Sequence, residues 1–152
     1  MNIGELVTDF ALPDENGETR RLSDYLKEGP VVLFFYPAAM TSGCTAETCY
    51  FRDLAAEFKA VGAVRVGISK DAPKRQKMFA ETNRLDYPLL SDSEGVVAKQ
   101  MGVRRTVAVG PFVTRRMTFV IDTDFRLIDV IHNEVTMTDH ADRALKTLRG
   151  RA

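Results

Sequence analysis

The sequence has few cysteines: there are two in 152 residues, Cys44 and Cys49, five positions apart. Two thiols are too few for the disulfide framework on which small secreted domains rely. In a cytosolic protein, such a pair is more often free, catalytic or redox-active than a structural link. The cysteine count therefore favours thiol chemistry over a disulfide scaffold.

An excess of charge and a long apolar run are also missing. The 21 basic and 21 acidic residues balance, so no global field favours a nucleic-acid partner or an anionic membrane. The longest apolar stretch, Val31–Met40, is about half a membrane span and contains Pro37. The opening segment, MNIGELVTDF, has no basic region followed by an apolar one. We therefore expect no secretory signal, no membrane association and a cytoplasmic address.

The residues that are present alternate between strand and helix patterns. Asn16-Gly17 predicts the turn of an N-terminal hairpin, with Ser23 then capping a short helical turn. The apolar run Val31–Tyr36 predicts a strand buried on both faces. A helix over Thr45–Val61, ended by Gly62, and a strand over Ala63–Ser69 complete a βαβ unit.

The rest of the chain continues this pattern. We expect helices over Pro73–Arg84, Val96–Met101 and from Thr138 or Asp139 to Leu148, with the segment Tyr87–Asp92 between the first two, and two strands within Met117–Ile131. No linker or repeat divides the sequence. The prediction is one α/β domain over residues 1–152, with a central sheet flanked by helices.

Cys44 stands where such a fold places its chemistry. It follows a buried strand and opens a helix, and ligands in open α/β sheets lie beyond the carboxyl ends of the strands. A helix N-terminus presents unpaired N–H groups and a positive dipole, which stabilise a thiolate. Gly43 allows the backbone to approach closely, and Thr41 adds a hydroxyl three residues before the sulfur. These features indicate a reactive thiol.

Other interpretations of the cysteines exist. Cys44 and Cys49 could be small buried hydrophobic residues. Together with His132 and His140 they could supply four zinc ligands, although the spacings match no compact zinc-finger pattern. Four residues separate the cysteines, which excludes a thioredoxin-type C-x-x-C motif.

The segment PAAMTSGC, Pro37 to Cys44, resembles the peroxiredoxin motif P-x-x-x-T-x-x-C. The second cysteine five residues later and the FRD at Phe51–Asp53 are similar to the PrxQ subfamily, also called bacterioferritin comigratory protein. DFALPDENG, YPLLSD and TFVID are similar to other segments of that family, so the resemblance covers nearly the whole chain. Ser42 departs from the family, which commonly has proline there. The resemblance implies a thioredoxin-like fold with a mixed sheet and an N-terminal hairpin.

The resemblance also implies roles for individual residues. Cys44 would be the peroxidatic cysteine, which peroxide oxidises to a sulfenic acid, and Cys49 the resolving cysteine, which closes a disulfide with it. Thr41 would hydrogen-bond thiolate and peroxide, and Pro37 would shield the sulfur from water. The family pattern R-x-[ST]-F places the catalytic arginine at Arg116 rather than at Arg115.

Simpler interpretations of these side chains remain open. Arg116 could be a solvated cation at a strand end, Cys49 a core residue, and Thr41 and Pro37 ordinary turn residues. Glu47 stands where the family has an acid or amide that orients an arginine, but it could equally be an exposed acid in the first helical turn. The segment Gly102–Arg115, basic at its ends, could be a plain loop, a rim over the peroxide pocket or a docking site for a reductant.

The predicted activity is therefore that of a thiol peroxidase without metal, haem, flavin or another cofactor. Its substrates would be hydrogen peroxide and organic hydroperoxides, and its reductant thioredoxin or a similar dithiol protein. The resemblance implies a monomer. Two alternatives are a peroxide sensor or relay that uses the same cysteines, and a holdase whose activity would not need Cys44.

Overall fold

A mixed five-stranded sheet forms the centre of the molecule. The structure, a computed structural model, describes residues 1–103 and 115–151. The strands of the sheet lie in the order β5-β4-β3-β6-β7. Their bounds are Val31–Phe35 for β3, Val64–Ser69 for β4, Leu89–Ser91 for β5, Met117–Ile121 for β6 and Leu127–His132 for β7. β3, β4 and β5 run parallel, whereas β6 and β7 are antiparallel to their neighbours, which confirms the predicted βαβ unit and the mixed sheet.

The central strand β3 is buried on both faces, as its unbroken apolar sequence predicts. Because side chains alternate along a strand, its residues divide between two cores. Val31, Leu33 and Phe35 belong to one apolar cluster. Val32 and Phe34 join Tyr36 in the other.

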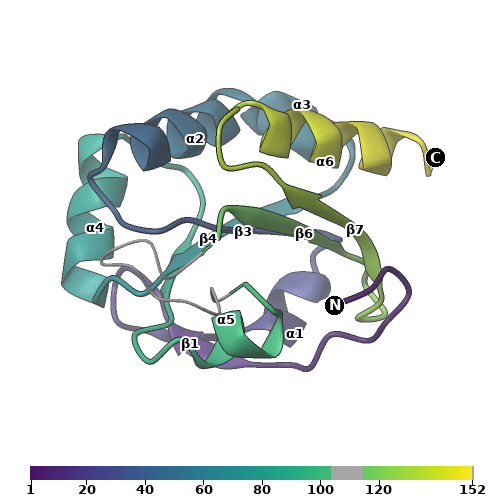
Figure 1. The fold of residues 1–152 in the computed structure, drawn as a ribbon, viewed down its shortest axis with the longest axis horizontal. Helices are drawn as coiled ribbons and strands as arrows, with labels where there is room; N and C mark the ends of the chain where they lie inside the picture. Colours follow the sequence, from purple (N-terminus) through teal and green to yellow (C-terminus); the bar gives the residue numbers. More distant parts are fainter. Residues whose placement is uncertain (104–114, 152) are drawn as a thin grey trace.

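Helices cover both faces of the sheet (Figure 1). Their bounds are Leu22–Leu26 for α1, Ser42–Asp53 for α2, Ala55–Ala60 for α3, Pro73–Thr82 for α4, Val96–Gln100 for α5 and Asp139–Arg149 for α6. α1 and α5 contribute to the core on one face, and α2, α3, α4 and α6 to the core on the other. Among the described residues, no helix combines the length and apolarity that a membrane crossing needs.

The long helix predicted over Thr45–Val61 is in fact two helices. α2 begins three residues earlier, at Ser42, because Thr41 is extended and acts as the N-cap residue. The helical backbone then breaks at Leu54 before α3 begins. No glycine or proline marks this break, so the pattern of apolar residues gave no sign of it. The predicted end is confirmed, since Gly62 adopts a left-handed φ of 69°.

The N-terminal hairpin is confirmed, with β1 at Ala11–Pro13 and β2 at Thr19–Arg21. Gly17, with a φ of 78°, closes its turn. The predicted cap at Ser23 is wrong, because α1 already begins at Leu22. The carboxylate of Asp9 instead accepts the Ser23 N–H, at 2.9 Å, and so caps the helix from outside it.

Candidate active site

The candidate site lies at the edge of the sheet where β3 and β4 end. The chain leaves β3 at Phe35 and enters α2 at Ser42, which puts Cys44 in the first turn of that helix. β6 runs antiparallel to β3, with Met117 paired to Phe35. The residue before β6, Arg116, therefore reaches the same edge although it is far from Cys44 in the sequence.

Cys44 and Arg116 are in direct contact. The thiol is fully buried, and Arg116 Nη2 donates a hydrogen bond to its sulfur at 3.2 Å. The backbone N–H of Arg116 donates to Glu134 Oε2, at 3.0 Å, which fixes the start of β6. Arg116 is therefore not a solvated cation at a strand end. The pair offers a buried sulfur nucleophile next to a fixed, half-buried positive charge.

Gly43 is what lets Arg116 come so close to the helix. A Cβ at this position would lie 2.8 Å from Arg116 Nη2 and 3.5 Å from its Cζ. It would also lie 3.8 Å from the sulfur of Met137. A larger residue at this position would require the end of the Arg116 side chain to shift away from the first turn of α2.

Replacing Gly43 by alanine should therefore separate helix stability from reactivity. Alanine favours helices over glycine by about 1 kcal/mol. Its Cβ nevertheless displaces the guanidinium, so we expect Cys44 oxidation by peroxide to slow by about tenfold or more. Amide exchange in α2 and quenched-flow oxidation rates measure the two effects. An unchanged rate would show that the guanidinium can shift without loss of function.

Thr41 and Pro37 lie in the chain between β3 and α2, ahead of Cys44. The Thr41 hydroxyl donates to the Ala38 carbonyl, at 2.8 Å, and forms no hydrogen bond with Cys44 within the described part of the chain. Since that hydroxyl uses its only proton, its oxygen remains free to accept a hydrogen bond. Pro37 is half-buried at the start of the loop.

Two residues that the sequence analysis did not single out hold this loop. Asp71 Oδ2 accepts the Ala39 N–H, at 2.7 Å, and Arg75 Nη2 donates to the Ala39 carbonyl, at 3.3 Å. Asp71 and Arg75 also form an ion pair, at 3.2 Å, and Ser69 donates to Asp71 at 2.7 Å. The sequence contained a signal for the place of Asp71 near the site, because this residue follows the carboxyl end of β4 by two positions, at the same edge of the sheet as Cys44. We call Asp71 and Arg75 the loop clamp.

Cys49 faces a different neighbour. Its thiol is half-buried and donates to Asn83 Oδ1, at 3.6 Å, at the C-terminal end of α4. Both cysteines are free thiols, and both lie within the intact helix α2. The structure thus brings Cys44 to Arg116 but leaves Cys49 pointing toward α4.

Glu47 is not the exposed acid of a first helical turn. Its side chain is fully buried, and neither carboxyl oxygen has a hydrogen-bond partner among the described residues. Burial raises its pKa to about 8, against the opposing influence of the Arg116 charge. His140 Nε2 lies 3.5 Å from Glu47 Oε2 and is equally buried. Sequence reasoning missed His140 as a neighbour of the site, because its partners come from three separate segments.

The four residues considered as zinc ligands do not gather in one place. His132 contacts Glu134, at 2.7 Å, and His140 contacts Thr118, at 2.8 Å. Within residues 1–103 and 115–151, no three His, Cys, Asp or Glu side chains lie close enough to share a metal ion.

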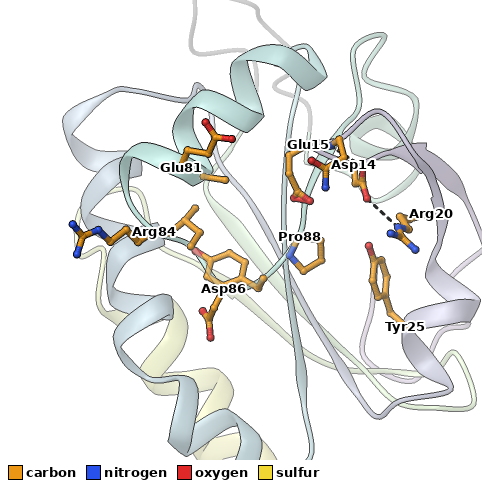
Figure 2. Close-up of a pocket in the computed structure, with 12 residues that line it drawn as sticks. Asp14, Glu15, Arg20, Tyr25, Glu81, Arg84, Asp86 and Pro88 are labelled. Carbon is orange, nitrogen blue, oxygen red and sulfur yellow. Dashed lines mark hydrogen bonds and ion pairs between the residues drawn. The ribbon is translucent and has the colours of Figure 1, made fainter.

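Five pockets on the described surface have linings that do not include Cys44. One of about 540 Å³ opens between the hairpin and the end of α4 (Figure 2). Tyr25 points there toward the ion pair of Arg20 and Asp14, whose Nε and Oδ2 are 2.9 Å apart. None of the predicted site residues lines this pocket or four further pockets on the described surface. The remaining predicted segment, Gly102–Arg115, falls largely outside the described residues.

Ser42, the departure from the family motif, is the first residue of α2. Proline is favoured at that position, and the residue before it must be extended, as Thr41 already is, with φ −85° and ψ 154°. We therefore expect Ser42→Pro to stabilise the protein by up to about 1 kcal/mol through the unfolded state. Chemical denaturation would measure this, with peroxidase activity nearly unchanged. A lower midpoint of unfolding would contradict it.

Comparison with known proteins identifies the family of this chain. The AhpC/TSA family model matches residues 3–130. A putative peroxiredoxin of Mycobacterium tuberculosis is 58% identical over 98% of this chain and 97% of its own length. Peroxiredoxin Bcp of Bacillus subtilis is 38% identical over 98% of this chain and 96% of its own length. The crystal structure of peroxidoxin BcpB from Mycobacterium tuberculosis superposes with a TM-score of 0.95, at 57% identity, over 100% of this chain and 99% of that one.

The matches span nearly the full length of both partners and include the segment that contains Cys44 and Arg116. They also confirm the thioredoxin-like fold expected from the sequence. The chain accordingly belongs to the AhpC/TSA family, within the Bcp/PrxQ peroxiredoxins, and is a thiol peroxidase.

Proposed function

We propose that this peroxidase reduces hydrogen peroxide and organic hydroperoxides at Cys44 and resolves the product with Cys49. The hydrogen bond from Arg116 to the buried Cys44 sulfur is the observation that supports the first step best. A cation beside the sulfur favours the thiolate, which is the nucleophile.

In the first step, the Cys44 thiolate attacks one oxygen of the peroxide. The sulfur–oxygen bond forms as the oxygen–oxygen bond breaks, and the electron pair of that bond leaves with the other oxygen. That oxygen takes up a proton to give water or an alcohol, and Cys44 becomes a sulfenic acid. The Arg116 guanidinium stabilises the charge that moves onto the leaving oxygen. The Thr41 hydroxyl accepts a hydrogen bond from the incoming peroxide, and Pro37 limits the access of water.

In the second step, the Cys49 thiolate attacks the sulfenic sulfur. A Cys44–Cys49 disulfide forms, and hydroxide leaves and is protonated to water. A dithiol protein such as thioredoxin then reduces the disulfide by exchange and is itself oxidised. No residue in this scheme needs a metal or an organic cofactor.

Peroxide consumption with thioredoxin and its reductase tests the proposal, with Cys44→Ser and Cys49→Ser beside the unsubstituted protein. We expect many turnovers, complete loss with Cys44→Ser, and a single oxidation event with Cys49→Ser. Activity that survives Cys44→Ser would overturn the assignment of the nucleophile. Oxidation without turnover under any generic dithiol would instead favour a peroxide sensor or relay.

A further inference from the structure

Glu47 occupies an unusual place in α2, because it lies between the two cysteines and is buried without hydrogen bonds from the described residues. The titratable groups facing it are Arg116 ahead of β6, Glu134 ahead of α6, His140 on α6 and Tyr87 ahead of β5, with Cys44 on its own helix. An ionised carboxylate in such a place loses hydration that the protein does not replace.

His140 does not supply the missing charge. The Asn133 carbonyl can only accept, so His140 Nε2 carries a proton and donates it there, at 2.8 Å. Nδ1 then accepts from the Thr118 hydroxyl, at 2.8 Å. Burial lowers the pKa of His140, so its ring is neutral near pH 7. The 3.5 Å approach of Nε2 to Glu47 is therefore not an ion pair.

The other titratable groups around Glu47 do not reverse its preference for the protonated, neutral form. Burial favours neutral Glu47, and the negative charge of Glu134 acts in the same direction, whereas Arg116 favours the ionised form. Burial outweighs Arg116 and raises the pKa of Glu47 to about 8. Burial also raises the pKa of Tyr87 well above its usual value, so this phenol stays neutral. Near pH 7, the folded helix thus keeps Glu47 protonated.

We propose that Glu47 is a positioning residue for the second step. As pH rises, this residue makes the folded start of α2 less stable, and so favours the opening that brings Cys49 to Cys44. The inference rests on the proposed disulfide. It follows from the location of Glu47, because any unwinding between the two cysteines exposes its carboxyl group to water.

The direction of the pH effect follows from the pKa of Glu47 in the folded helix and in the open segment. In the open segment the carboxyl group has its ordinary pKa of 4.5, whereas in the folded helix its pKa is about 8. The extra stability of the closed helix is complete below pH 4.5 and is lost as pH rises through 8. Between these limits opening releases a proton, so the opening constant rises by up to about tenfold per pH unit.

Hydrogen exchange of the reduced protein measures this opening directly. The full chain carrying Cys44→Ser and Cys49→Ser removes thiol titration from the measurement. After correction for intrinsic exchange rates, we expect the opening constant of Thr45–Cys49 to rise on the order of 100-fold between about pH 5 and about pH 8. Adding Glu47→Gln, which keeps the shape and removes the proton, should make it constant.

A matched control is Glu57→Gln, which changes an acid on the neighbouring helix α3 and should leave the pH dependence intact. A dependence caused by Arg116, Glu134, His140 or Tyr87 would persist in Glu47→Gln and would overturn the inference. A flat profile in the parent variant would overturn it as well.

The catalytic consequence is measured at a single pH, so that Cys49 ionisation is the same in both proteins. After Cys44 is oxidised, Glu47→Gln should form the disulfide about tenfold or more slowly near pH 7 and accumulate more sulfinic acid. Equal rates would overturn the role of Glu47. If the unsubstituted protein forms no Cys44–Cys49 disulfide, the proposed second step fails, and the exchange experiment alone then decides whether Glu47 controls the opening.

Discussion

Arg116→Ala is expected to slow the oxidation of Cys44 by peroxide by about 100- to 1,000-fold, the loss typical when a donor to developing negative charge is removed. The guanidinium touches the sulfur directly, at 3.2 Å, and the sulfur belongs to a fully buried residue while Arg116 is half-buried. Water that enters the truncated site cannot replace the guanidinium, because the dipoles of water molecules are not held in position. Stability should change less than rate.

The measurement is quenched-flow oxidation followed by mass spectrometry, since the chain contains no tryptophan to report by fluorescence. Arg115→Ala is the matched control, because it removes an adjacent arginine and should leave the rate within about twofold, as expected for a charge screened by water. The oxidation rate of Arg116→Lys should lie between those of the unsubstituted protein and Arg116→Ala, because lysine keeps the positive charge but lacks the planar guanidinium. Equal rates for the Arg115 and Arg116 variants would remove the guanidinium from the mechanism.

The second large effect concerns the helix between the cysteines. An i,i+5 pair in an intact α-helix has Cα atoms about 8.6 Å apart, from about 7.5 Å of rise and about 140° of rotation. A disulfide needs about 4.4–6.8 Å. The sulfurs also point differently, one toward Arg116 and the other toward Asn83. Closing the bond therefore requires about one turn of α2 to unwind.

We accordingly expect oxidised protein to lose amide protection over Thr45–Phe51. Unwinding would also break the buried hydrogen bond from the Tyr87 hydroxyl to the Thr48 carbonyl, which is 2.7 Å long. Hydrogen exchange with mass spectrometry on both redox states measures the change, and Cys49→Ser, which cannot close the bond, serves as the control. That variant should form the sulfenic acid without resolving it to a disulfide, and excess peroxide should therefore overoxidise it more readily to sulfinic acid. Equal protection in the two states, with the disulfide confirmed, would refute the unwinding.

Much of the fold was predictable because its signals are local. The unbroken apolar run of β3 and the Asn16-Gly17 turn each determine structure within a few residues of themselves. The start of α2 was less predictable from the sequence, because it depends on the extended backbone of Thr41 rather than on a capping side chain.

The candidate site was predictable only in part. Strand order and helix placement indicated a reactive Cys44, but its contact with Arg116 joins segments 72 positions apart. Only the family resemblance identified that arginine. The burial of Glu47 and the contacts of His140 depend on the packing of α6 against α2, which no pattern in either helix reveals.

The loop clamp has a consequence for the return to the reduced state. Because Asp71 and Arg75 bind both backbone groups of Ala39, we expect the chain ahead of Thr41 to stay in place during the proposed opening of α2. Met40, with its left-handed φ of 68°, then forms the boundary between the fixed and the released segment. Once the proposed disulfide is reduced, we expect the helix to regrow by about one turn from an anchored end. Helix growth takes about nanoseconds per residue, so encounter with the reductant, rather than refolding, should set the pace of recovery.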